Sequence, residues 1–152
     1  LLIYSIISIL IFGFYNFRKK ALFFAGDIGS ISLGMFIFFV GFYLTYALNS
    51  PLILLLVIVY GADAGNTLLY RKFFTKENVL DPHRHHIYQK LVDIRKMSHL
   101  KVSVIYAGIQ LFVNMIIYKT YQLELQIQFL VAAILVSLFT IFYIYLFKKL
   151  KV

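Results

Sequence analysis

Long apolar runs, separated by short polar stretches, make up most of this chain. Five such runs occur, at about Leu1–Tyr15, Ile28–Leu48, Leu52–Tyr70, Val102–Tyr118 and Leu123–Phe147. A helix needs about 20 apolar residues to cross the hydrocarbon core of a bilayer, and about 17 is the lower limit. The pattern therefore predicts an all-α fold, a polytopic membrane helical bundle with about five transmembrane helices.

The first run, LLIYSIISILIFGFY, begins without a methionine. It has neither a basic leading segment nor a small-residue cleavage site, so it lacks the pattern of a signal peptide. We expect residues 1–152 to be the C-terminal part of one integral membrane domain whose upstream part is missing. The short NSP stretch, Asn49–Pro51, predicts a tight turn whose proline starts the next helix.

Composition agrees with a membrane protein. The chain is 62% hydrophobic and 14% charged, whereas soluble domains carry about 25% charged residues. The mean hydropathy is +0.86. There is no cysteine, which excludes disulfides and thiolate metal sites.

The positive charges are distributed unevenly along the chain. If five spans alternate in direction, one side of the membrane receives 14 of the 15 Lys and Arg residues and the other receives Lys119 alone. Cytoplasmic connections are rich in Lys and Arg, so the basic side is predicted to be cytoplasmic. Topology thus accounts for a charge that in a soluble protein would favour nucleic acid, and no nucleic-acid partner is predicted.

Two acidic residues interrupt the apolar runs. Asp27 lies in GDIGS, Gly26–Ser30, at the predicted cytoplasmic start of a helix. It suits either a helix cap or a Mg²⁺ ion shared with a substrate phosphate. Asp63 lies near the cytoplasmic end of the third run. An ionisable residue there is a functional candidate, and the alternatives are a structural pairing with Arg71 or Arg84 and simple exposure to water.

The connection DPHRHHIYQKL places three histidines and an arginine between His83 and His86. Three hypotheses remain open. Zinc would require three or four ligands in a tetrahedral array; a phosphate or nucleotide would be bound by the guanidinium of Arg84; or the loop is simply a basic segment attracted to anionic lipid headgroups.

Together, NFRKKALFFAGDIGSISLG, DAGNTLLYRK and HRHHIYQKL resemble the C-terminal half of the polyprenyl-phosphate N-acetylhexosamine-1-phosphate transferases, glycosyltransferase family 4. The family includes phospho-N-acetylmuramoyl-pentapeptide transferase and undecaprenyl-phosphate GlcNAc-1-phosphate transferases. The resemblance covers nearly all of this chain. It implies transfer of a sugar-1-phosphate from a UDP-N-acetylated sugar to polyprenyl (undecaprenyl) phosphate at the cytoplasmic face of the bacterial inner membrane. UMP is released, and synthesis of a cell-envelope polysaccharide such as O-antigen or capsule begins.

The resemblance also implies roles for individual residues. Asp27 matches the family's metal-binding aspartate, with Mg²⁺ or alternatively Mn²⁺ as the ion. Arg84 and His86 match positions of its histidine loop, where the nucleotide-sugar diphosphate binds. The other implied substrate-binding residues are His85, Gly26, Gly29 and Ser30, and further candidates are Asp63, Asn16, Tyr88 and Gln89. The implied partners are the UDP-sugar, the polyprenyl phosphate, the membrane and a second copy of the chain in a homodimer.

Two departures from the family pattern matter. Many GlcNAc-type members read Arg-x-His-Ile-His-His where this chain has Arg84-His85-His86-Ile87-Tyr88-Gln89. This is similar to members that use 6-deoxy-N-acetylhexosamines, which implies N-acetylfucosamine or N-acetylquinovosamine as donor sugars. The family's paired acidic motif and Asn-rich motif lie upstream and are not in this chain, so it is predicted to be inactive alone. The alternatives from other classes are a transporter or divalent-metal-binding membrane protein, and a lipid-binding anchor without chemistry.

Overall fold

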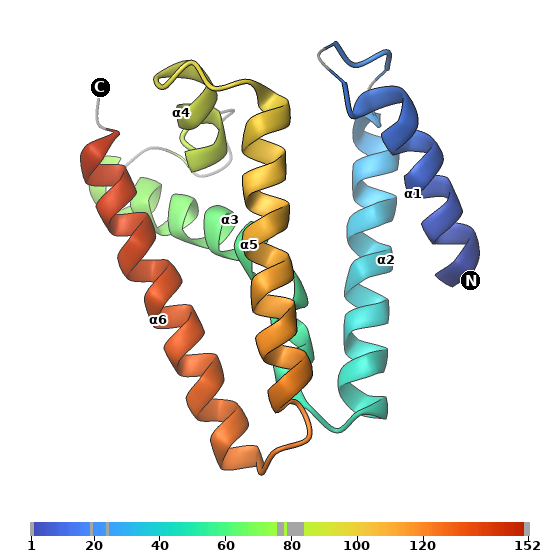
Figure 1. Ribbon diagram of the computed structural model, residues 1–152. Coiled ribbons are helices and arrows are strands. Elements are labelled where there is room, and N and C mark those ends of the chain that lie inside the picture. The colour runs from blue at the N-terminus through green and yellow to red at the C-terminus, as the bar shows by residue number, and fades with distance from the viewer. Residues whose placement is uncertain (1, 19, 24, 76–77, 79–83, 151–152) are drawn as a thin grey trace.

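The computed structural model describes residues 2–18, 20–23, 25–75, 78 and 84–150, and all secondary structure within them is helical (Figure 1). The elements are α1 (Leu2–Asn16), α2 (Gly26–Ala47), the 3-10 helix η1 (Pro51–Val57), α3 (Ile58–Tyr70), the π-helical turn η2 (Arg71–Thr75), α4 (Ile87–Asp93), α5 (His99–Thr120) and α6 (Leu125–Lys149).

The predicted helical membrane bundle is confirmed. Four stretches of the described chain are long and apolar enough to cross a membrane: Gly26–Ala47, Pro51–Phe74, His99–Thr120 and Leu125–Lys149. The fifth predicted span corresponds to α1, which is apolar but has 15 residues. It is shorter than the four others and shorter than the length that a bilayer core requires.

The connections lie at two opposite ends of the bundle (Figure 1). The α1–α2 connection, α4 and the end of α6 lie at one end, while the α2–η1 and α5–α6 turns lie at the other. Lys119, in the last turn of α5, belongs to the second end. The bundle therefore has the alternation of connections that the distribution of Lys and Arg predicts.

A group of hydrogen bonds around Asn49, Ser50 and Gln128, the polar clasp, joins α2 and η1 to α6 at the end of the bundle that carries few charges. After α2 the chain turns at Asn49, whose φ is +48°, while the Ser50 N–H donates to the Thr45 carbonyl at 3.1 Å and the Asn49 N–H to the Tyr46 carbonyl. This pair of hydrogen bonds is a Schellman motif. The Ser50 hydroxyl then donates to Gln128 Oε1 at 2.7 Å, and both side chains are buried. The clasp fixes the start of the third span against α6.

The third span is interrupted, although its sequence predicts one continuous helix. Backbone torsions of −129° and 24° at Val57 separate η1 from α3. The break leaves an N–H group at Val59 without an intrahelical acceptor, and backbone groups inside a bilayer must be satisfied within the protein. Gln110 of α5 does this, because its Oε1 accepts from Val59 N at 2.9 Å and its Nε2 donates to the Leu55 carbonyl at 3.3 Å.

The packed part of the bundle consists of η1, α3, α5 and α6. One apolar cluster fills its middle, with Leu52, Ile58, Val113, Ile117 and Leu135 among its buried members. In contrast, α1 and α2 have no buried residue, and α2 packs against η1. Many apolar side chains on these two helices are exposed, which is favourable in a bilayer because lipid is as apolar as the side chains themselves.

Candidate functional site

The short helix α4 packs against the charged end of α3 and α6. Its first residue, Ile87, is 1% exposed and packs with Tyr143, Phe147 and Leu150. A seven-residue helix is too short to be stable by itself. Its position therefore depends on these contacts with the membrane helices, which hold the histidine segment, residues 84–86, just before it.

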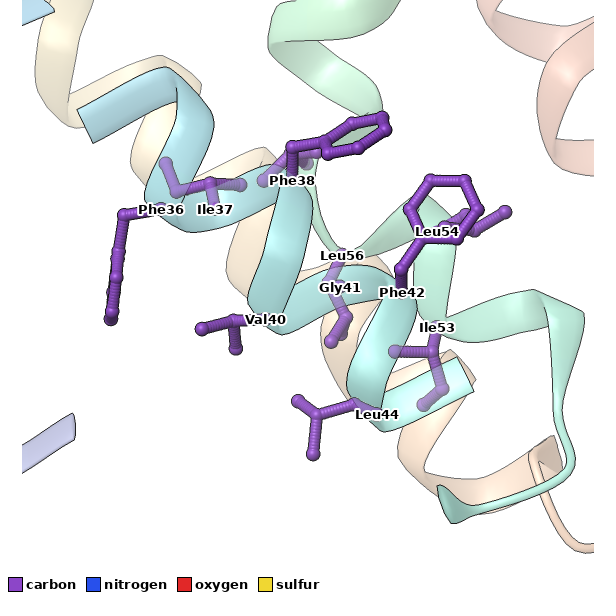
Figure 2. A pocket seen from close by; sticks show the side chains of 11 residues that line it. Phe36, Ile37, Phe38, Val40, Gly41, Phe42, Leu44, Ile53, Leu54 and Leu56 are labelled. Carbon is purple, nitrogen blue, oxygen red and sulfur yellow. The ribbon is translucent and has the colours of Figure 1, made fainter. Parts of the chain in front are cut away.

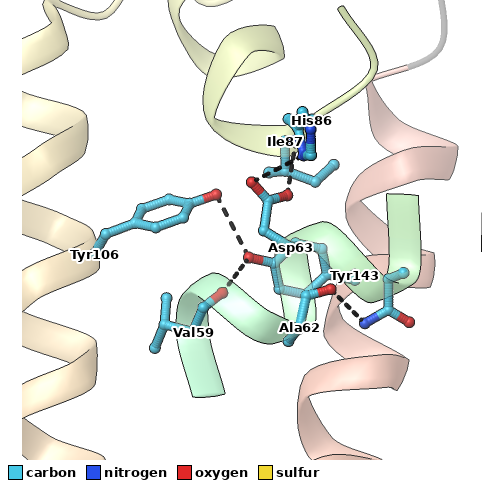
Figure 3. Close-up of polar contacts among 8 residues, drawn as sticks. Val59, Ala62, Asp63, His86, Ile87, Tyr106 and Tyr143 are labelled. Atoms are coloured by element: carbon cyan, nitrogen blue, oxygen red, sulfur yellow. Dashed lines mark hydrogen bonds and ion pairs between the residues drawn. The ribbon is translucent and has the colours of Figure 1, made fainter. Parts of the chain in front are cut away.

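The most buried acid of the described chain lies directly below α4 (Figure 3). Asp63 is 2% exposed, and its Oδ1 accepts a hydrogen bond from the Ile87 N–H at 3.0 Å. Its Oδ2 lies 3.7 Å from His86 Nδ1. The carboxylate thus contacts the first backbone N–H of α4 and the side chain of His86. Of the sequence alternatives for Asp63, exposure to water is wrong, and Arg84 lies against Asp93 instead.

A cation–aromatic contact adds to the docking of α4. Lys90 Nζ lies 5.6 Å from the ring centre of Tyr70 and 5.4 Å from that of Phe147. The two rings are parallel, with centroids 4.6 Å apart. An ammonium group in this position is attracted by the π-electrons. Burial lowers the pKa of Lys90.

The electrostatic surroundings of His86 favour its neutral form. Burial lowers the pKa of His86, and the positive charges of Arg71 and His85 lower it further. Arg71 is 2% exposed and donates to the Asn78 carbonyl at 2.6 Å. The Asp63 carboxylate lies 3.7 Å from His86 Nδ1, which is beyond hydrogen-bond distance, and the two groups form an ion pair only when His86 is protonated. A neutral imidazole can both donate and accept hydrogen bonds.

Tyr88 and Arg84 flank His86 on the outer side of the segment. The rings of His86 and Tyr88 are stacked, with centroids 5.4 Å apart. Burial and the Asp63 charge raise the pKa of Tyr88, so its hydroxyl remains a donor. Arg84 makes a two-point contact with Asp93, at 3.0 Å and 3.2 Å, and its side chain is 71% exposed. An exposed pair of this kind is weak, so the guanidinium can exchange Asp93 for another anion.

Asp27 lies in the first turn of α2, not before the helix as the sequence predicts. The N-cap is Ala25, with no side-chain cap, so the capping role of Asp27 is not realised. Gly26 has φ of +64°, a left-handed conformation that favours glycine, and a Cβ on Gly29 would lie 3.1 Å from Ala25 Cβ. Ser30 Oγ donates to the Gly26 carbonyl at 2.8 Å. The Asp27 side chain is exposed, at the positive end of the helix dipole.

The predicted site residues form two groups at the same end of the bundle. Asp63, His86 and Tyr88 are in one network, with Arg84 beside it, whereas Asp27 and Ser30 lie on α2 in the other (Figure 1). No contact between the two groups occurs among the described residues. Asn16, at the end of α1, accepts from the Phe23 N–H at 3.3 Å and so shapes the loop that leads to Asp27.

Three buried polar atoms have no hydrogen-bond partner within the described chain: Asn16 Nδ2, Thr67 Oγ1 and Gln89 Oε1. Asn16 and Gln89 are among the residues that the sequence singles out, and Thr67 lies one turn after Asp63 on α3. Buried polar atoms are usually paired. Water or a ligand polar group would satisfy the atoms near α4.

Metal binding has limited support within the described part of the chain. No three His, Asp or Glu side chains gather closely enough there to hold a metal ion, and His83, one of the zinc candidates, lies outside the described residues. Mg²⁺ differs from zinc because it binds through one or two carboxylates plus substrate phosphates. The exposed carboxylate of Asp27 fits that donor set.

The sequence did not single out the polar side chains that brace this end from inside the membrane. Tyr143 Oη donates to the Val59 carbonyl at 3.4 Å and lies 3.5 Å from Tyr106 Oη (Figure 3). With Gln110 these residues surround the break in the third span. This bracing role could not be predicted from the sequence, because a tyrosine or glutamine within an apolar run is equally consistent with a place at the membrane interface.

An apolar cavity of about 280 Å³ lies between α2 and η1 (Figure 2). All of its lining residues are apolar, including Phe36, Phe42, Ile53 and Leu54. It offers no donor or charge to a phosphate, so it does not form part of the site near α4. Its location and chemistry suit a lipid tail or a packing helix.

Comparison with known proteins gives no match to a protein-family model, to a curated protein or to a solved structure.

Proposed function

We propose that this chain is the C-terminal part of a Mg²⁺-dependent phosphoglycosyl transferase. It transfers an N-acetylhexosamine-1-phosphate from a UDP-sugar to a polyprenyl phosphate at the cytoplasmic face of the bacterial inner membrane. The product would begin an envelope polysaccharide such as O-antigen or capsule. One observation carries the proposal: the histidine segment, held by the packing of α4, lies at the same end of the bundle as the exposed Asp27.

Each group has a role in binding the diphosphate of the donor. The guanidinium of Arg84 has the fork geometry that pairs with phosphate oxygens, and its weak contact with Asp93 leaves it available. His86 and His85 supply further hydrogen bonds. Asp27 would hold Mg²⁺, which neutralises charge on the diphosphate and on the departing UMP.

Tyr88 and Gln89 are proposed to contribute to the choice of sugar. They occupy the positions where many GlcNAc-type sequences have two histidines. Gln89 Oε1 is buried without a partner in the described chain, and Tyr88 is stacked on His86. Because Tyr and Gln at these positions resemble members that use 6-deoxy sugars, we propose UDP-N-acetylfucosamine or UDP-N-acetylquinovosamine as the donor.

The transporter alternative has less support. It requires acids that face each other across a pathway inside the membrane, whereas the described contacts of the Asp63 carboxylate are with Ile87 and His86 of the histidine segment. Asp27 is at the bundle's end. A lipid-binding anchor needs no buried carboxylate, and burial of such a group is costly.

The test is UMP release by the full-length protein in membranes containing undecaprenyl phosphate. Donors are UDP-GlcNAc, UDP-N-acetylfucosamine and UDP-N-acetylquinovosamine, each with and without Mg²⁺. We expect Mg²⁺-dependent release that is lost in Asp27→Asn and retained in Glu124→Gln, an acid-to-amide change at the opposite end. Residues 1–152 alone should release no UMP. Absence of release with every donor, or full release by Asp27→Asn, would overturn the proposal.

A further inference from the structure

We propose that Asp63 is a positioning residue, which acts from inside the third span to hold the histidine segment in the place and orientation that donor binding needs. The inference rests on the proposed function for what the segment binds. The holding itself rests on geometry alone and is tested separately below.

The Asp63 carboxylate lies at the start of α4. His86 is the N-cap of this helix, with no side-chain cap, so the first N–H groups of α4 lack the acceptor that an N-cap side chain usually supplies. The Asp63 carboxylate supplies this acceptor from another helix, because the Ile87 N–H donates to it at 3.0 Å. The Tyr88 N–H is a second backbone donor to this carboxylate. A residue in a membrane span thereby fixes where α4 begins.

The same carboxylate also faces the side chain of His86. Asp63 Oδ2 lies 3.7 Å from His86 Nδ1, while Tyr88 stacks on the imidazole ring. The ring is thus held from two sides, by a charge below and an aromatic face beside it. Arg84 and His85 precede it directly in the chain, so fixing His86 also restricts where the guanidinium can reach.

Burial of the Asp63 carboxylate has an energetic cost. A carboxylate that is 2% exposed is costly to bury, and apolar residues of similar size pack a helix equally well or better. The contacts of Ile87 with Tyr143 and Phe147 and of Lys90 with two rings already provide packing for α4. The carboxylate adds what apolar packing does not, which is a directional contact that sets the position of the segment.

The experiment uses the absence of cysteine in the chain. Ile87→Cys places one thiol at a site that is 1% exposed, and its alkylation rate in the full-length protein reports undocking of α4. We expect Asp63→Ala to raise this rate about tenfold or more, because the Ile87 N–H loses its acceptor. Asp63→Asn keeps an acceptor oxygen and should leave the thiol protected, as should the control Glu124→Ala at the far end. A rate in Asp63→Ala equal to that of the Ile87→Cys background would overturn the proposal.

The second readout is donor kinetics in proteins with Ile87 restored. Asp63→Ala should raise KM for the UDP-sugar by about tenfold with a smaller change in kcat, because α4 and the segment that binds the donor are displaced while the acceptor side stays intact. Asp63→Asn keeps α4 docked but removes the charge that faces His86 Nδ1, so it should also raise KM, through loss of the orientation of the imidazole ring. An unchanged KM in Asp63→Asn, together with a protected thiol, would show that the carboxylate serves structure alone, and the proposal would be wrong. The kinetics of Asp63→Asn also test the positioning role if Asp63→Ala fails to fold.

The two proposals fail in different ways. If the unsubstituted protein releases no UMP with any donor, the transferase proposal fails. The thiol-protection experiment still decides whether Asp63 holds the segment. If UMP is released and the Asp63 variants bind the donor normally, the transferase stands and the positioning role falls.

Discussion

Replacing Gln110 by methionine removes the hydrogen bonds at the break in the third span with little change in side-chain volume. In the native protein Gln110 Oε1 accepts from Val59 N at 2.9 Å, and Nε2 donates to the Leu55 carbonyl and to Asn114 Oδ1. Methionine makes none of these bonds. The change therefore measures what the network contributes to stability, with packing approximately constant.

The expected loss follows from what each partner can do without Gln110. The Leu55 carbonyl keeps a second donor, because Ile58 N–H also donates to it. Val59 N–H is left without an acceptor, and a buried orphan donor costs about 1–3 kcal/mol. Polar side-chain contacts between membrane helices average only about 0.6 kcal/mol. Since Val59 is a backbone group that cannot reach water, we expect a loss of about 2 kcal/mol.

The assay is reversible unfolding in mixed micelles, monitored by circular dichroism as the denaturing detergent is increased. The matched control is Gln126→Met, the same change at an exposed position of α6. We expect Gln110→Met to lose about 2 kcal/mol and the control to lose less than about 0.5 kcal/mol. Equal losses in the two variants would refute the argument that Gln110 repairs a break in the backbone ladder.

Three further results are expected. Ser50→Ala should destabilise the protein by about 1 kcal/mol in the same unfolding assay, because Gln128 loses a buried donor, and a neutral effect would contradict the clasp. Lys90→Met should accelerate alkylation of the Ile87→Cys thiol by about threefold through loss of the cation–aromatic contact. An unchanged alkylation rate would show that this contact does not help to dock α4. Because the pKa of His86 is lowered in the folded state, the unfolded state binds the proton first as pH falls below about 6.5. The contribution of His86 to stability should therefore decrease with falling pH in that range and be constant above it, and His86→Gln should remove this contribution.

Some features of this protein are properties of local stretches, and the sequence predicts them. The apolar runs predict the membrane helices because the length and hydropathy of a run decide by themselves whether it can cross a bilayer. The distribution of Lys and Arg predicts the alternation of connections for the same reason, since each charge stays at the end of its own helix. The turn at Asn49–Pro51 is equally local, and the structure has it.

Other features depend on which helix faces meet, and only the tertiary structure decided them. The third run reads as one helix, yet it breaks at Val57, because Gln110, 51 positions away from Val59, offers the acceptor that makes the break tolerable. Asp27 resembles a helix cap in sequence, but the helix starts before it.

The contacts of Asp63 are also decided by tertiary packing, although the sequence singles out the residue itself. The sequence marks this acid as unusual because a carboxylate within an apolar run is costly, and it offers charged residues as partners. The structure instead pairs it with a backbone N–H and a histidine that follow it by more than 20 positions. A backbone donor leaves no trace in the amino-acid pattern, so the contact that holds the histidine segment follows only from the packing of α4 on α3 and α6.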